Sequence, residues 1–157
     1  MEQERWNDPP LNEEWPPFRL GETLAREVVL DAASIRAFAA MTGDTNPLHH
    51  DEAAARQSRF GRLIASGSQT ASLLASMTAA LVTERCAGLG LEVLYRFRKA
   101  VLADEPLRAE LELVDMLAKP HRPDIVLTFA GRLIKLETGE VAVDGHTKSM
   151  IFREARR

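Results

Sequence analysis

The chain has 157 residues, enough for one domain with a single core and too few for two ordinary domains. Its 20 Lys and Arg residues against 23 Asp and Glu residues give a net charge of −3, so a nucleic-acid partner is not expected. The single cysteine, Cys86, cannot form an internal disulfide, and no run of about 18 apolar residues could span a bilayer. We therefore expect a cytoplasmic protein with no membrane contact.

The first 17 residues differ in composition from the rest of the chain. They are acidic, show little periodicity and contain half of the eight prolines, which is typical of an extension rather than of a packed core. Trp6 and Trp15 could dock this segment on the body or on a partner subunit. We expect an N-terminal extension over residues 1–17, one domain over residues 18–152 and a short tail over residues 153–157.

Short elements are predicted in the first third of the domain. Residues 18–30 alternate well enough for a strand, and Asp31 can cap a helix that ends at Gly43. Asp51 can cap a short alanine-rich turn over residues 52–56. A loop is expected between this turn and the next long element.

The longest predicted helix covers residues 68–85, which contain neither glycine nor proline and place apolar residues at helical spacing. Its surface carries many small residues: Ala71, Ser72, Ala75, Ser76, Ala79 and Ala80. Small side chains would let a neighbouring sheet approach the helix closely. We expect a sheet to wrap this helix.

Four strands are predicted after the helix, separated by turn-forming and proline-rich breaks. They cover residues 91–99, 107–117, 124–136 and 141–152. Short connections favour antiparallel neighbours. The sequence therefore predicts an α+β domain with an antiparallel sheet curled around a long central helix.

The segment Gly43-Asp-Thr-Asn-Pro-Leu-His-His50 holds the strongest functional signal in the chain. Asp44 and His49 lie five residues apart, which would separate their side chains on a continuous helix. Pro47 and the residue before it, Asn46, interrupt helical geometry, so the carboxylate and the imidazole could act on one proton. The alternative is an ordinary turn in which Asp44 and Asn46 bond local amides.

The motif Asp44-Thr-Asn-Pro-Leu-His49, followed by Ile64-Ala-Ser-Gly67 at the start of the long helix, resembles the MaoC-like dehydratases, which include the (R)-specific enoyl-CoA hydratases. The likeness covers about residues 18–151. It implies a hot-dog fold, a homodimer or dimer-based oligomer, and acyl-CoA thioester substrates without a further cofactor.

The resemblance also implies roles for particular residues. Asp44 and His49 match the catalytic pair, and Gly67 matches the glycine whose amide faces the thioester oxygen. Ser66 stands where many members carry histidine, which puts chain-length preference in doubt. Asn46, Ser66 and Ser68 are candidate substrate contacts, although Asn46 could equally brace the turn.

The expected reaction adds water to, or removes it from, the 2,3 double bond of an acyl thioester. It requires a held water, a base, a proton for the α carbon and stabilisation of the carbonyl oxygen. Arg96 and Arg98 share one face of a predicted strand and could bind the phosphates of coenzyme A, or could form a solvated strand face. His49, His50 and Asp51 match no common metal-ligand spacing, so no metal is expected.

Two other functions remain open from the sequence. A hot-dog thioesterase also needs a carboxylate, a positioned water and a helix-end amide, but it directs attack at the carbonyl carbon. A non-catalytic module would bind acyl-CoA or support a partner without turnover. Thiol release and loss of the enoyl absorbance distinguish these functions from hydration.

Overall fold

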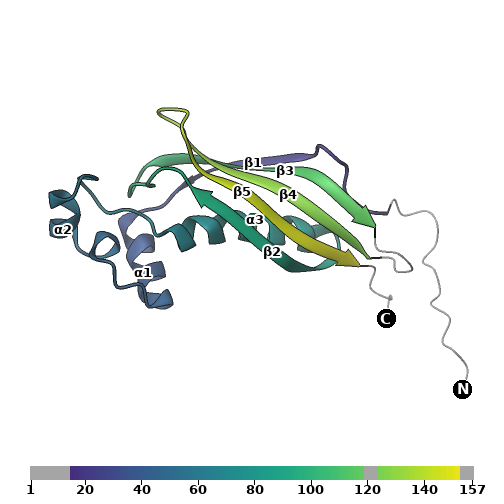
Figure 1. Cartoon of the computed structure of the whole chain (residues 1–157), viewed down its shortest axis with the longest axis horizontal. Helices are drawn as coiled ribbons and strands as arrows, with labels where there is room; N and C mark the ends of the chain where they lie inside the picture. Colours follow the sequence, from purple (N-terminus) through teal and green to yellow (C-terminus); the bar gives the residue numbers. More distant parts are fainter. Residues whose placement is uncertain (1–14, 119–123, 153–157) are drawn as a thin grey trace, which may run out of the picture.

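The computed structural model describes residues 15–118 and 124–152 and contains one antiparallel sheet with a long helix on its concave side (Figure 1). The helices are α1 (Ala32–Thr42), α2 (Glu52–Gln57) and α3 (Gly67–Arg85), with a short 3-10 helix η1 (Pro47–His49). The strands are β1 (Thr23–Val29), β2 (Ala87–Phe97), β3 (Pro106–Ala118), β4 (Ile125–Lys135) and β5 (Val141–Phe152). The strand order is β1-β3-β4-β5-β2, which confirms the predicted α+β hot-dog fold.

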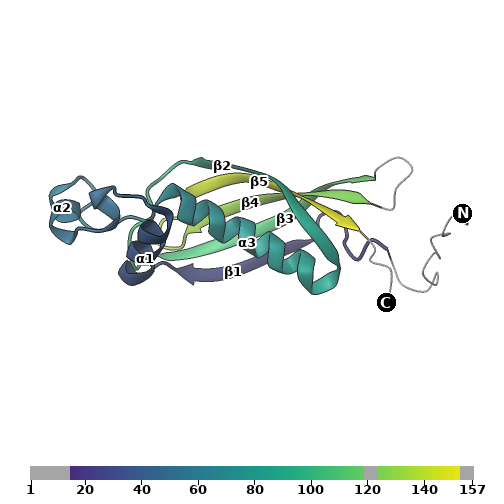
Figure 2. The same ribbon diagram turned by 90° about the horizontal axis from the view of Figure 1, so that it is seen from below.

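Helix α3 lies across the sheet, as the view from below shows (Figure 2). Its sheet-facing side is made by Leu74, Met77, Thr78, Leu81 and Val82, all of which are buried. The apolar side chains among them fill the space between helix and sheet, so hydrophobic burial holds the two layers together, and the Thr78 hydroxyl forms a hydrogen bond of 2.9 Å with that of Thr147 on β5.

The prediction that small residues bring α3 close to the sheet is wrong in its placement. Ser72, Ser76, Ala79 and Ala80 are exposed, and the apolar stripe at helical spacing faces the sheet instead. Ser72, Ser76 and Ala79 border a hollow of about 370 Å³ between α3 and β2. The small side of the helix is therefore open in the single chain.

Local capping explains where the first helix begins and ends. The carboxylate of Asp31 accepts a hydrogen bond of 2.7 Å from the amide of Ser34. Gly43 ends α1 with φ of 72°, a left-handed conformation that glycine adopts without steric cost. Both ends agree with the sequence prediction, and the second leads directly into the Asp44 segment.

Two strands differ from their predicted bounds. Strand β2 begins at Ala87 rather than at residue 91, so it includes Gly88 and Gly90, which precede the predicted strand. A Cβ at Gly88 would lie 2.6 Å from the Val82 side chain, so the glycine lets β2 pass close to the end of α3. Strand β1 is shorter than residues 18–30, yet its predicted first residue, Phe18, is buried in the core.

The predicted extension and tail fall almost wholly outside the described residues. Of residues 1–17, only the last three are described, and Trp15 among them packs against the core. Residues 153–157 are not described. Cys86, at the end of α3, is a half-buried free thiol packed against the core. No helix within the described ranges is both long and apolar enough to cross a membrane.

Candidate active site

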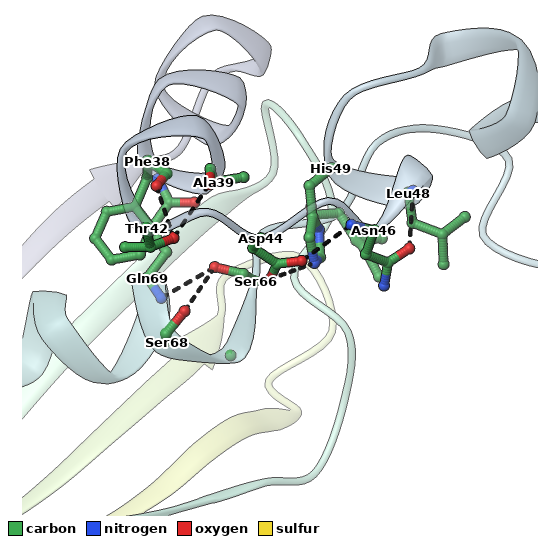
Figure 3. Close-up of polar contacts among 12 residues, drawn as sticks. Phe38, Ala39, Thr42, Asp44, Asn46, Leu48, His49, Ser66, Ser68 and Gln69 are labelled. Atoms are coloured by element: carbon green, nitrogen blue, oxygen red, sulfur yellow. Dashed lines mark hydrogen bonds and ion pairs between the residues drawn. The ribbon is translucent and has the colours of Figure 1, made fainter.

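Asp44 and His49 point toward each other between α1 and α2 (Figure 3). The Nε2 atom of His49 lies 3.4 Å from Oδ2 of Asp44. The His49 side chain is 7% exposed, whereas the Asp44 side chain is 33% exposed. The pair therefore joins a buried imidazole to a carboxylate that solvent and a ligand can reach.

The imidazole of His49 has a defined orientation. Its Nδ1–H donates a hydrogen bond of 2.8 Å to the carbonyl oxygen of Ile64, since a carbonyl can only accept. In the neutral ring this leaves Nε2 without a proton and with its lone pair on the side of Asp44. At 3.4 Å the two acceptors are beyond ordinary direct hydrogen-bond distance, and both can accept from a third group.

The turn between the two residues is held by its own side chains. Asn46 accepts a hydrogen bond of 3.1 Å from the amide of Leu48 and so caps η1, in which Pro47 is the first residue. Oδ1 of Asp44 accepts from the amide of Asn46 at 3.0 Å, which leaves Oδ2 for the imidazole side. Asp44 and Asn46 therefore bond local amides, as in an ordinary turn, and the Asp44 carboxylate still approaches the His49 imidazole. Asn46 serves to brace the turn.

The positive end of α3 begins two residues after the carbonyl that orients His49. Ser66 is 3% exposed and caps the helix, because its hydroxyl oxygen accepts from the amide of Gln69 at 3.2 Å. The hydroxyls of Ser66 and Ser68 are 3.1 Å apart, and Ser68 is exposed. The amides of Gly67 and Ser68 donate to no group within the described ranges, so they are free to bind a negatively charged oxygen.

Gly67 also faces a side chain of the sheet. A Cβ at this position would lie 3.0 Å from the ring of Phe97, at the end of β2. A real Cβ would push the ring away, so glycine permits close approach to the first turn of α3. Phe97 itself is 57% exposed and borders the space in front of this turn.

Arg96 and Arg98 are not part of this group. Because side chains alternate along a strand, and Phe97 faces α3, Arg96 points to the opposite face of the sheet. Arg98 forms two hydrogen bonds with Asp144, of 2.7 and 3.2 Å, and this pairing lowers the pKa of the Asp144 carboxyl. Their contact with coenzyme A phosphates stays a prediction, and the pairing with Asp144 favours the solvated-face alternative for Arg98.

The structure adds three contacts that the sequence analysis missed. The backbone carbonyl of Ile64 orients His49, the ring of Phe97 faces Gly67, and His50 donates from Nε2 to the carbonyl of Asp44. A backbone acceptor has no sequence signal, because every residue carries the same carbonyl. The adjacent histidine pair could have indicated that His50 supports the turn.

Fold and site together define a hot-dog protein with an acid–imidazole pair beside a helix terminus. A family model for the MaoC-like domain matches residues 17–128. The chain therefore belongs to the MaoC-like dehydratase family, as its sequence motifs implied. A comparison with curated proteins finds no match.

Similar solved structures include two (R)-hydratases and a MaoC-like dehydratase. The R-hydratase PhaJ1 of Pseudomonas aeruginosa is 26% identical with a TM-score of 0.75, and the alignment covers 87% of this chain and 84% of that one. The (R)-hydratase of A. caviae involved in PHA biosynthesis is 25% identical with a TM-score of 0.70, and the alignment covers 87% of this chain and 98% of that one. The MaoC-like dehydratase of Rhodospirillum rubrum is 27% identical with a TM-score of 0.72, and the alignment covers 88% of this chain and 96% of that one. Family and neighbours support a hydratase or dehydratase without specifying its substrate.

Proposed function

We propose that this protein hydrates the 2,3 double bond of enoyl-CoA thioesters and catalyses the reverse dehydration, with Asp44 and His49 as the catalytic pair. The observation that carries the proposal is the 3.4 Å separation between His49 Nε2 and Asp44 Oδ2. Both atoms are hydrogen-bond acceptors when His49 is neutral, so one water can donate to each of them. Such a water would be held and polarised at one place.

His49 is the proposed base. Its Nδ1–H is committed to the carbonyl of Ile64, so Nε2 can take a proton from the bound water. Asp44 holds the second hydrogen of that water and stabilises the imidazolium that forms. The orientation of the imidazole ring supports this assignment of the two roles, which the sequence left open.

The atoms balance over one catalytic cycle. The water oxygen bonds to C3 of the enoyl group while one of its protons passes to Nε2 of His49. The electrons of the double bond move toward the thioester, whose oxygen becomes negative and accepts from the Gly67 amide at the positive end of α3. The imidazolium then returns the proton to C2 on the same face, and dehydration follows the same steps in reverse.

We further propose that the enzyme is a homodimer formed through β2. This strand is an edge of the sheet and exposes Leu89, Leu91, Val93, Leu94 and Phe97, each at least 40% accessible. An apolar edge strand of 11 residues is a ready surface for pairing with a second copy. Sedimentation velocity with the wild-type protein and a Val93→Lys variant would measure the assembly, and an unchanged dimer in the variant would argue against this surface.

Activity assays distinguish hydration from the rival reactions. Purified protein is incubated with crotonyl-CoA and longer enoyl-CoA substrates, and both the enoyl absorbance and free thiol are followed. We expect loss of the enoyl absorbance without thiol release, and a large fall in this rate for His49→Ala. Thiol release would indicate a thioesterase, and no turnover across the panel would indicate a binding module.

A further inference from the structure

A buried ion pair joins the end of β4 to the turn before β3. Nζ of Lys135 lies 3.0 Å from Oε1 of Glu105, and the two side chains are 10% and 8% exposed. Burial of a charge is costly unless the charge is both paired and hydrogen-bonded. A surface pair such as Arg132 with Glu110, in which the arginine side chain is 57% exposed, carries no such cost.

The second carboxylate oxygen of Glu105 holds a tight turn. Oε2 accepts a hydrogen bond of 3.0 Å from the backbone amide of Leu102. Between them Asp104 adopts φ of 61°, an uncommon conformation for a residue other than glycine. Both oxygens of the carboxylate are therefore used, one by the ammonium group and one by the turn.

This turn supports a short antiparallel pairing. Residues 101–103 pair with residues 63–65 through two backbone hydrogen bonds, each of 2.8 Å, and Leu102 stands opposite Ile64. In this geometry the flanking residues make the bonds, so the N–H and C=O of Ile64 point away from residues 101–103.

The backbone N–H and C=O of Ile64 bond to the turn that carries His49. Its amide donates to the carbonyl of Leu48 at 3.1 Å, and its carbonyl accepts from Nδ1 of His49 at 2.8 Å. Residues 63–65 thus lie between the Glu105 turn on one side and His49 on the other. A shift of the turn would move the carbonyl that sets the imidazole tautomer.

We propose that Glu105 is a positioning residue for His49, acting through its bond to the Leu102 amide and the paired segments 101–103 and 63–65. Lys135 pairs with the buried Glu105 carboxylate at 3.0 Å and holds it in place. The kinetic consequence rests on the proposed function, whereas the effect on the His49 tautomer does not.

Two double variants test the link without leaving a buried unpaired charge. Glu105→Met with Lys135→Met removes both charges and the acceptor for Leu102, while Glu105→Gln with Lys135→Met keeps a carbonyl acceptor of similar shape. The ¹⁵N spectrum of labelled histidine reports which ring nitrogen carries the proton when the imidazole is neutral. The chain has four histidines, and the His49 signal is identified by its loss in His49→Gln.

We expect the Met pair to lose the single Nδ1–H tautomer of His49 and to lower kcat roughly 10- to 100-fold, since small misplacements of catalytic groups have effects of this size. KM should stay unchanged, because Glu105 makes no substrate contact in this proposal. The Gln pair should keep the wild-type tautomer and kcat. Glu110→Gln, which removes a carboxylate paired to Arg132 at the surface, should change neither quantity.

The outcomes separate this proposal from the proposed function. A Met pair with the wild-type tautomer would overturn the positioning role, and so would equal loss of the tautomer in both pairs. If the Met pair does not fold, the Gln pair decides: retention of the tautomer supports the link through the Leu102 acceptor, and its loss refutes it. A wild-type protein without hydratase activity would sink the reaction while leaving the tautomer test intact.

Discussion

Asp44→Asn separates catalysis from folding at the centre of the site. The asparagine can keep its side-chain oxygen at the Oδ1 position, where it accepts from the Asn46 amide at 3.0 Å, so the turn is preserved. Its NH2 group then replaces Oδ2 and donates toward Nε2 of His49. This occupies the lone pair that the proposed base uses, and it removes the charge that stabilises the imidazolium.

The size of the effect follows from the 3.4 Å separation of the pair. Two unit charges at this distance attract by about 1 kcal/mol in bulk water and by about 5 kcal/mol at an effective dielectric constant of about 20. His49 is almost fully buried and Asp44 is one-third exposed, so the effect lies between these limits. Each 1.36 kcal/mol corresponds to about a tenfold rate change, and we expect kcat for crotonyl-CoA hydration to fall about 10²- to 10³-fold.

The assay compares initial rates of enoyl absorbance loss with unfolding in urea. The free energy of unfolding should change by less than about 1 kcal/mol, because the hydrogen bond from the Asn46 amide survives. Asp51→Asn is the matched control, because the Asp51 carboxylate also accepts from nearby backbone amides, those of Ala53 and Ala54 at the start of α2, and asparagine caps a helix equally well. A kcat within threefold of wild type in folded Asp44→Asn protein would refute the paired mechanism.

Three further predictions concern the sheet and its charges. Gly145→Ala should lower the free energy of unfolding in urea by roughly 2–3 kcal/mol, because a Cβ there would clash with the Leu94 carbonyl oxygen of β2. In the control Gly90→Ala a Cβ meets nothing within 4 Å, so no such loss is expected, and equal losses in the two variants would contradict the prediction. Burial raises the pKa of Tyr95 to about 12, so between pH 10 and 12 the unfolded chain loses a proton that the folded chain keeps, and stability should fall by roughly 1.4 kcal/mol per pH unit. Phenolate absorbance of this single tyrosine measures the shift, and ionisation near pH 10 in folded protein would oppose it. The hydrogen bond from Arg85 lowers the pKa of Glu22, so its stabilisation is present above pH 4.5 and is lost as the pH falls through the lowered value. Glu22→Gln should cost roughly 0.5–1 kcal/mol at neutral pH and nothing in strong acid, and a loss that does not depend on pH in thermal melts would count against the pair.

Local chemistry accounts for the parts of the fold that the sequence predicted well. Helix α1 is capped by Asp31 and ends at Gly43 as expected, and β5 covers residues 141–152 as predicted. The apolar spacing of residues 68–85 predicts α3 to within one residue. These features depend on neighbours within a few positions of the chain, which a single sequence contains.

The sequence alone also determined which residues to consider for catalysis, because proline and asparagine between an acid and an imidazole force a non-helical turn. Tertiary structure decided how they are used. The carbonyl of Ile64, 15 positions beyond His49, selects the tautomer, and a partner 46 positions away occupies Arg98. Likewise, only the packed sheet shows that the small side of α3 faces outward and that β2 runs through its glycines. Such contacts join backbone groups and side chains that are remote in the chain, so they arise only when the layers pack.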